Sequence, residues 1–238
     1  MELAPENDLQ RPRIVRHGEF NVVRDDLLEG GTKRRALVKL VPRVEADEVV
    51  YASHPYGHGQ YALGLACAEF GKACTIFSAT SSGRVDVFEK TRALPGVTMK
   101  LFDAECTQAQ LADAASAYAR ERKAHFFPVG FDFPAFRAEL TRVALDLRVS
   151  PSEVWALGGS GSLVRALVEA WPNAAINAVS MGFAHGNMGR AKVYVVPESP
   201  AEAALLPPPY PSAREYDAKI WQFVSVYGQP DALVWNVA

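Results

Sequence analysis

Residues 49–78, VVYASHPYGHGQYALGLACAEFGKACTIFS, contain a strand, a loop, a helix and a second strand in succession. The run 49–53 is apolar and β-branched, and 59–70 is an alanine-rich helical stretch that ends at Gly71, a natural C-cap. The run 73–78 is again strand-like. A strand that is followed by a helix and another strand favours parallel pairing, so this stretch predicts an α/β fold.

The same alternation continues in both directions along the chain, with Gly or Pro at most junctions. After a start that we expect to be disordered, strands are predicted at 20–23, 97–102, 125–128, 154–157, 175–181, 192–196 and 232–237, and helices at 33–40, 83–93, 107–122, 133–147, 162–170 and 213–227, with a proline-dense linker at 200–211. We therefore predict two small three-layer αβα lobes with mostly parallel sheets.

Composition sets outer limits on function. The 238 residues are 49% hydrophobic and 22% charged, which is typical of a folded protein with a substantial core. The formal net charge is −2 and the 25 basic residues are scattered, so nucleic acid is not a default partner. No apolar run is long enough for a membrane span, and we expect a cytoplasmic protein. Cys67, Cys74 and Cys106 lack metal-ligand spacing and are expected to be reduced packing residues.

A glycine-rich loop, Gly158-Gly159-Ser160-Gly161-Ser162, stands between a predicted strand and a predicted helix. Such a turn exposes backbone N–H groups and the positive end of the helix, which together can hold a phosphate. A tight turn without a ligand explains the glycines equally well. The spacing completes neither a G-x-G-x-x-G dinucleotide motif nor a G-x-S-x-G elbow.

Lys33 follows two glycines at a predicted helix start. Glycines at 30 and 31 would let the backbone come close to a flat ligand while the amine reaches over it. The alternative is a solvated cation beside Arg34 and Arg35. The surrounding sequence decides between them.

The segment 23–37, VRDDLLEGGTKRRAL, resembles the lysine segment of the aminocyclopropane-carboxylate deaminase and D-cysteine desulfhydrase group. These are fold-type-II, tryptophan-synthase-β-like pyridoxal-phosphate enzymes. Further similar segments follow in the family's order, at 51–53, 127–130 and 158–163, so the resemblance runs from about 22 to 182. It implies a pyridoxal-phosphate-enzyme-like core at 20–182, with a smaller lobe at about 45–125 inserted, and a cofactor cleft between the lobes.

The resemblance also implies roles for individual residues. Lys33 would form the internal imine with pyridoxal 5'-phosphate and, once freed by the substrate amine, serve as base or acid at the α-carbon. Gly158 to Ser162 would hold the cofactor phosphate. Ser53 would lie at the cofactor or substrate face. Independently of the resemblance, Asp25 and Asp26 could orient Lys33 or its arginine neighbours, although turn chemistry alone explains aspartates at these positions.

The chain also departs from the family pattern. Relatives place an asparagine near the cofactor ring oxygen, where this chain offers His54, Tyr56 and His58, so we assign these three to the site. Pro55 and Gly57 preclude a shared helix face for the histidines, and we predict no metal. Relatives are also longer, so 183–238 is expected to be a divergent, shortened C-terminal segment that completes the larger lobe. Candidates there and nearby for the group facing the pyridine nitrogen are Ser180, Tyr210, Tyr216 and Asn236.

The predicted function is therefore a pyridoxal-phosphate-dependent lyase or deaminase that acts at the α-carbon of an amino acid or related primary amine, in a homodimer. One alternative is a pyridoxal-phosphate enzyme that modifies an amino-acid-linked nucleobase, of the kind found in bacteriophage DNA hypermodification. The charge balance counts against modified DNA as substrate, although the cluster 33–35 is basic. The other alternative is a non-catalytic protein that binds phosphate or a cofactor.

Overall fold

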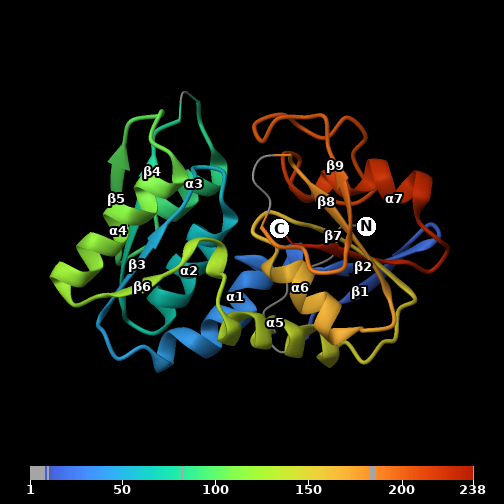
Figure 1. Ribbon diagram of the computed structural model, residues 1–238, viewed down its shortest axis with the longest axis horizontal. Helices are drawn as coiled ribbons and strands as arrows, with labels where there is room; N and C mark the ends of the chain where they lie inside the picture. Colours follow the sequence, from blue (N-terminus) through green and yellow to red (C-terminus); the bar gives the residue numbers. More distant parts are fainter. Residues whose placement is uncertain (1–8, 10, 82, 183–185, 238) are drawn as a thin grey trace. The chain divides into compact units, whose positions relative to one another are not determined.

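A computed structural model describes residues 9, 11–81, 83–182 and 186–237. The chain divides into two compact units, which we describe separately (Figure 1). The first unit comprises Met1–Arg35 and Pro134–Ala238, and the second comprises Ala36–Phe133. Helix α1 (Gly31–Leu40) begins in the first unit and continues into the second.

The second unit contains a four-stranded sheet whose strands pair in parallel in the order β5-β4-β3-β6. Its strands are β3 (Glu48–Ala52), β4 (Ala73–Ala79), β5 (Val97–Phe102) and β6 (His125–Phe127), and its helices are α2 (His58–Glu69), α3 (Asp86–Arg92) and α4 (Gln108–Arg122). Leu111, Ala115 and Ala119 pack from α4 against Val50 and Phe77. The i, i+4 spacing of the α4 residues places them on one face of the helix. Helix α2 contacts β3 and β4, α3 contacts β5, and the two helices contact each other.

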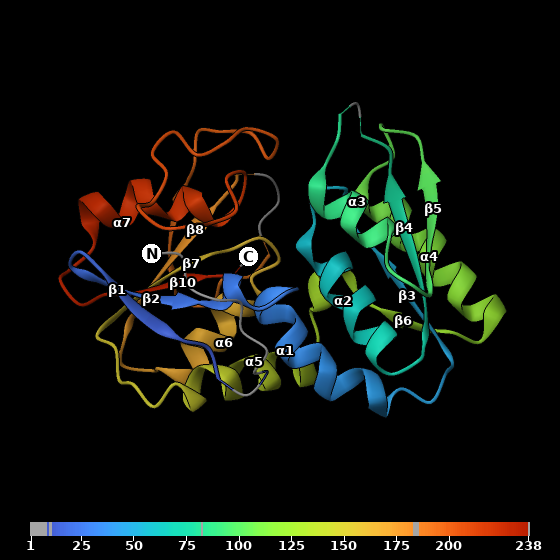
Figure 2. The ribbon, with the colours of Figure 1, turned by 180° about the vertical axis from the view of Figure 1, so that it is seen from behind.

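The first unit contains a six-stranded sheet in the order β1-β2-β10-β7-β8-β9. All pairs are parallel except β1 with β2, which form a hairpin. Its strands are β1 (Ile14–His17), β2 (Phe20–Arg24), β7 (Glu153–Leu157), β8 (Ala175–Ser180), β9 (Lys192–Val195) and β10 (Leu233–Asn236), and its longer helices are α5 (Pro134–Asp146), α6 (Ser162–Ala170) and α7 (Trp221–Tyr227). Figure 2 shows this sheet from behind.

Two apolar clusters cover the two faces of this sheet. On one face, Val143 of α5 and Leu167 of α6 pack with Val154 and Trp235. On the other, Val224 of α7 packs with Trp155. Each unit is therefore a sheet between helical layers, and the predicted α/β class with two αβα lobes and mostly parallel sheets is confirmed.

The prediction of a disordered start up to residue 20 was wrong for 14–17. Strand β1 pairs antiparallel with β2, from Ile14 opposite Val23 to His17 opposite Phe20. Its side chains are mostly half-buried, so the strand carries little alternation of its own. The hairpin partner, rather than local hydrophobicity, forms this strand.

The predicted helix 213–227 was wrong in its first half. The chain reaches α7 through an irregular segment and a short 3-10 helix, η4 (Asp217–Ile220). Tyr216 has φ −130° and ψ −104°, which is not helical. This break brings Tyr216 and Asp217 to the site described below.

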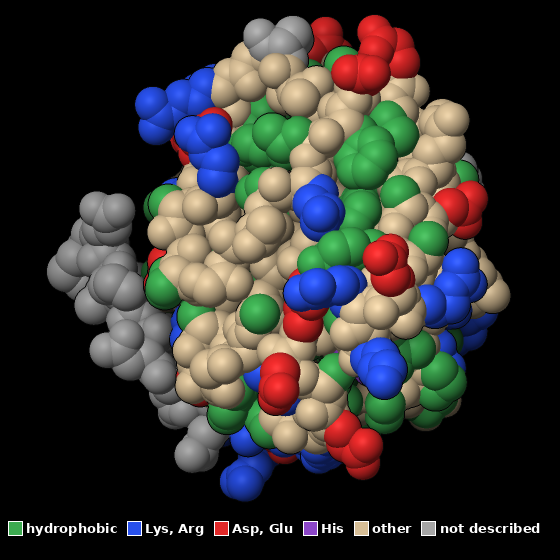
Figure 3. Space-filling model, turned by 90° about the vertical axis from the view of Figure 1, so that its left-hand side faces the viewer, with side chains coloured by type: hydrophobic (Ala, Val, Ile, Leu, Met, Phe, Trp, Pro, Cys, Tyr) green, Lys and Arg blue, Asp and Glu red, His purple; other side chains and the backbone are tan. Residues whose placement is uncertain are grey.

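The three cysteines are free thiols, and Cys67 and Cys74 are buried, as predicted. None of the helices in the described part of the chain is both long and apolar enough to cross a membrane. Figure 3 shows one side of the second unit, where basic and acidic side chains are interspersed. On that side, the described residues form no basic stripe of the kind that binds nucleic acid.

Candidate active site

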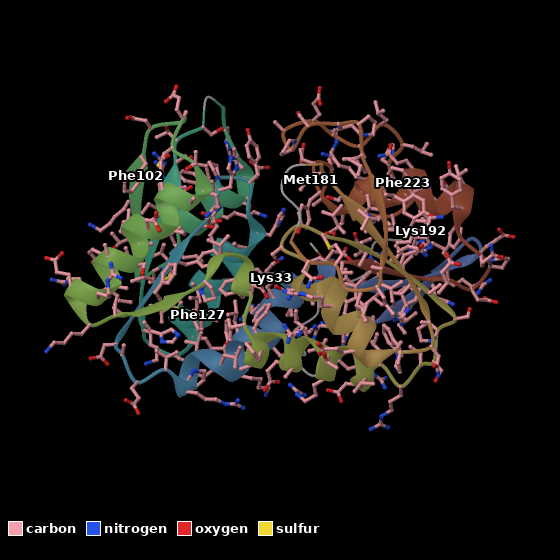
Figure 4. The ribbon with its side chains drawn as sticks, viewed as in Figure 1. Lys33, Phe102, Phe127, Met181, Lys192 and Phe223 are labelled. Atoms are coloured by element: carbon pink, nitrogen blue, oxygen red, sulfur yellow. The ribbon has the colours of Figure 1, made fainter. Side chains whose placement is uncertain are left out.

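Lys33 lies in the first turn of α1 (Figure 4). Its side chain is partly buried, and its Nζ is 5.9 Å from the centroid of the Tyr216 ring. Burial lowers the pKa of Lys33 from its ordinary value, while the negative charge of Asp217 opposes this shift. The lowered pKa increases the fraction of neutral amine, which is the form that attacks a carbonyl or accepts a proton.

Gly31, before Lys33, makes a close contact that the sequence analysis did not predict. A Cβ on Gly31 would lie 1.9 Å from the Val237 carbonyl oxygen, and Gly31 has φ +60°. The close approach of Val237, the residue after β10, therefore requires glycine here. It brings the start of α1 against the end of β10.

The glycine-rich loop connects β7 to α6, as predicted. Gly161 has φ +83°, and a Cβ there would lie 2.3 Å from the Asn187 carbonyl oxygen. The hydroxyls of Ser160 and Ser162 are 3.2 Å apart at the start of α6, which is nine residues long. Backbone N–H groups at a helix start, together with serine hydroxyls, are donors that suit a phosphate.

A segment that sequence analysis did not assign to the site packs over this loop. The Gly186 N–H donates to the Gly159 carbonyl at 3.2 Å, and a Cβ on Gly186 would lie 1.9 Å from the Ser160 carbonyl oxygen. Met188 fills the space that a side chain on Gly158 would need. The shape of the loop is therefore set by residues that follow β8. In the sequence, this packing is visible only as glycines at the positions of close contact.

Tyr216 connects the lysine to the loop. Besides its ring contact with Lys33, its hydroxyl oxygen lies 3.8 Å from the position of a Cβ on Gly159. Asp217 beside it is 2% exposed and accepts a hydrogen bond from the Val237 N–H at 3.1 Å. We did not predict Asp217 as a site residue, because residues 216–217 fall inside a stretch that looks like a continuous helix.

Of the four candidates for the group facing the pyridine nitrogen, Tyr216 is the one whose ring contacts the Lys33 amine. Ser180 accepts a hydrogen bond from the Gly182 N–H at 3.4 Å. The Asn236 side chain donates to the Pro211 carbonyl at 3.0 Å and accepts from the Ser212 hydroxyl at 2.6 Å. Tyr210 is buried, and its ring centroid lies 4.6 Å from that of His17.

The remaining predicted site residues lie together in the second unit, between β3 and the first turn of α2. The Ser53 hydroxyl donates to the His54 carbonyl at 3.0 Å. The rings of His54 and Tyr56 stack at 5.5 Å, and the Tyr56 and Ser81 hydroxyl oxygens are 3.4 Å apart. The His54 side chain is exposed as a whole, but partial burial of its imidazole lowers its pKa, which favours the neutral form. His58 is the first residue of α2.

The residues of the first unit fit pyridoxal phosphate. The cofactor needs an amine that is neutral part of the time, and burial of Lys33 provides it. It also needs a binding site for its phosphate group, which the loop at 158–162 can provide. The backbone of this loop packs so closely against Gly186 and Asn187 that only glycine fits at 161 and 186. Both requirements are met within one unit. The described residues contain no cluster of three metal-ligating side chains.

No protein-family model matches this sequence, and no curated protein matches it. Solved structures are nevertheless similar in fold. A homologue of ACC deaminase is 13% identical with a TM-score of 0.80, over 99% of this chain and 92% of that one. The processed form of threonine deaminase isoform 2 from Solanum lycopersicum is 13% identical with a TM-score of 0.73, over 92% and 78%. A pyridoxal 5'-phosphate-dependent aspartate racemase is 17% identical with a TM-score of 0.54, over 68% and 50%.

These identities are low, so the similarity establishes the fold. The fold is that of fold-type-II pyridoxal-phosphate enzymes, and the resemblance seen in the sequence is confirmed at this level.

Proposed function

We propose that this protein is a pyridoxal-phosphate-dependent enzyme of the lyase or deaminase type, acting at the α-carbon of an amino acid or related primary amine. One observation carries the proposal. The partly buried amine of Lys33 and the glycine-rich loop at 158–162 lie in the same unit and share a neighbour, Tyr216. The similarity in fold to the ACC deaminase homologue and the threonine deaminase supports it.

In this proposal Lys33 is the residue to which the cofactor aldehyde attaches, and residues 158–162 bind its phosphate. When bound, pyridoxal phosphate supplies a carbonyl for amines and a ring that accepts electrons from the α-carbon. The amine nitrogen Nζ of Lys33 removes or returns the proton of the substrate α-carbon, which a lysine with a lowered pKa can do near neutral pH.

Tyr216 and Asp217 complete the set in the first unit. The Tyr216 ring lies beside the Lys33 amine and orients it, since a ring face attracts an ammonium group. The carboxylate of Asp217 is held by the Val237 N–H and raises the pKa of Lys33. It thus limits how far burial can neutralise the amine, and keeps a proton available for return to the substrate.

From the second unit we propose Ser53, His54, Tyr56 and His58. Ser53 would lie at the cofactor or substrate face, His54 and His58 would take part in catalysis, and His58 and Tyr56 would also contact the cofactor. A histidine can donate the hydrogen bond to the ring oxygen that an asparagine donates in similar enzymes.

The first test is attachment of the cofactor. The purified chain is incubated with pyridoxal phosphate, reduced with borohydride and digested for mass spectrometry. We expect a visible absorption band that disappears on reduction, and a phosphopyridoxyl group on Lys33. Lys33→Ala should abolish both, whereas Lys39→Ala, an exposed lysine on the same helix, should change neither. A colourless, unlabelled chain would contradict the proposal.

The second test is turnover. The loaded protein is incubated with a panel of L- and D-amino acids and small primary amines, and release of ammonia or a keto acid is measured. Release that depends on Lys33 supports the lyase or deaminase type. Attachment without release from any substrate would show a non-catalytic cofactor-binding protein. A spectrum that responds to modified DNA and not to free amines would favour the nucleobase alternative.

The quaternary structure and location belong to the same proposal. We propose a homodimer in the cytoplasm that takes a small-molecule amine. Light scattering of the loaded protein measures the mass of the assembly and would contradict this if it returned the 25.9 kDa of one chain.

A further inference from the structure

A buried polar cluster lies beneath the first turn of α1. Asp25 and Arg35 have fully buried side chains, and the Arg35 Nε donates to the Asp25 Oδ1 at 2.6 Å. The Thr32 hydroxyl donates to the other carboxylate oxygen at 2.5 Å. The Trp235 indole N–H donates to the Thr32 hydroxyl at 2.8 Å. These four side chains form one connected network within the first unit.

Two residues of the network, Thr32 and Arg35, flank Lys33 in the sequence. Thr32 precedes it and Arg35 follows two residues later, and both are bonded to Asp25. Because Arg35 and Thr32 are held by the same carboxylate, the backbone between them has little freedom to rotate about the helix axis. The close contact of Gly31 with the Val237 carbonyl restrains the same turn, in addition to the two bonds to Asp25.

The network also reaches the phosphate loop through the sheet. Trp235 of β10 pairs with Ala156 of β7. Strand β7 ends at Leu157, and the glycine-rich loop begins at the next residue. The indole of Trp235 therefore provides a side-chain connection between the turn that carries Lys33 and β10, which pairs with the strand that leads to the loop.

Stability alone does not explain the network. Burial raises the pKa of Asp25 above its ordinary value, although Arg35 and Thr32 both act to lower it. Both partners of this ion pair are fully buried and have lost their hydration, which offsets much of their mutual attraction. Apolar side chains of similar volume often fill such positions with equal or better stability.

We propose that Asp25, Arg35, Thr32 and Trp235 are positioning residues that hold the Lys33 amine in register with the phosphate loop. The inference rests on the proposed function. It goes beyond it, because it assigns a role to four buried side chains that are not among the residues proposed to bind substrate or cofactor. It predicts that the amine changes its environment when the network is broken, even in the chain without cofactor.

The test uses Thr32→Val, which keeps the shape of the side chain and removes the hydroxyl, and Thr32→Ser, which keeps the hydroxyl. Acylation of Lys33 by acetic anhydride is followed by peptide mass spectrometry as a function of pH, in the full chain without cofactor. Thr32→Val should move the midpoint upward by about one pH unit, as the amine becomes more solvated. Thr32→Ser should restore the wild-type midpoint.

A second measurement uses the cofactor. Borohydride trapping at limiting pyridoxal phosphate should fall about tenfold in Thr32→Val, as expected for the loss of one or two hydrogen bonds, and recover in Thr32→Ser. The double variant Asp25→Leu with Arg35→Met should keep the wild-type unfolding midpoint and show the same changes. An unchanged acylation profile in Thr32→Val overturns the inference.

The two proposals fail in different ways. If the wild-type chain traps no pyridoxal phosphate while Thr32→Val still shifts the acylation midpoint, the positioning network stands and the proposed function falls. If the wild-type chain traps the cofactor and Thr32→Val traps it equally with an unshifted midpoint, the function stands and the network is only structural.

Discussion

Two of the segments with candidate site residues are held in contrasting ways. The turn that carries Lys33 is held by Trp235 and Val237, which are about two hundred positions away along the chain. The loop at 53–58 is held mostly by close neighbours, with Gln60 donating to the Pro55 carbonyl at 2.8 Å and the Gly57 N–H to the His54 carbonyl at 2.8 Å. Long-range contacts fix a residue against the whole sheet, whereas local contacts leave the loop free to vary. Substitutions should therefore cost more in the first segment.

The largest effect is expected for Gly31→Ala. The added Cβ would lie 1.9 Å from a backbone oxygen at φ +60°, so α1 or β10 must shift. We expect a loss of about 4 kcal/mol in the free energy of unfolding, measured with urea. Gly18→Ala is the matched control, because Gly18 has φ +59° with nothing within 4 Å, and it should cost about 1 kcal/mol. Equal losses in the two variants would refute the importance of the long-range contact.

The next effect concerns a long-range contact in the second unit. Burial raises the pKa of Tyr51 to about 12, and its hydroxyl accepts the Gly130 N–H at 3.1 Å. Because the folded chain holds this proton above the unfolded pKa of 10.0, the stabilisation is complete below pH 10 and is lost as the pH rises toward 12. The slope should be about 1.4 kcal/mol per pH unit. The free energy of unfolding, measured with urea across this pH range, should fall with this slope in the wild type and should lack this contribution in Tyr51→Phe.

A smaller effect is expected in the local loop. A Cβ on Gly57 would lie 2.4 Å from the Ser53 hydroxyl oxygen, a side-chain atom that can rotate away, and 3.1 Å from the His54 carbonyl oxygen. Gly57→Ala should cost about 1 kcal/mol in urea unfolding. Adding Ser53→Ala should recover part of this loss, since the two positions are in contact. A cost as large as that of Gly31→Ala would contradict the contrast between the segments.

The smallest effect on stability is expected for His54→Ala. The side chain is exposed, and its ring contact is with the nearby Tyr56. The unfolding midpoint should stay within about 0.5 kcal/mol of wild type. Under the proposed function, kcat/KM should nonetheless fall tenfold or more, which separates a site residue from a structural one. Wild-type kcat/KM in this variant would remove His54 from the site.

Local sequence patterns were sufficient to predict most of the helices and strands. The alternation of apolar runs, helical stretches and glycines predicts β3, α2, β4, β5, α4 and β7 close to their observed bounds. These elements are continuous apolar or helix-forming runs, most of them bounded by glycine or proline, so the signal lies within the segment. Strand β1 lacks that signal and depends on its partner β2. The break before η4 was also missed, because the sequence around Tyr216 reads as continuous helix.

The sequence by itself determined the α/β class, the resemblance to fold-type-II enzymes, and the choice of Lys33 and residues 158–162 as site candidates. These depend on residue type and spacing within short segments. Only the tertiary structure decided that Tyr216 and Asp217 join Lys33, that Gly31 accommodates Val237, and that Asp25, Thr32, Arg35 and Trp235 form one network. The reason is physical: apart from the bonds of Asp25 to Thr32 and Arg35, which span seven and ten positions, these contacts join positions far apart in the chain, and strand order places them together.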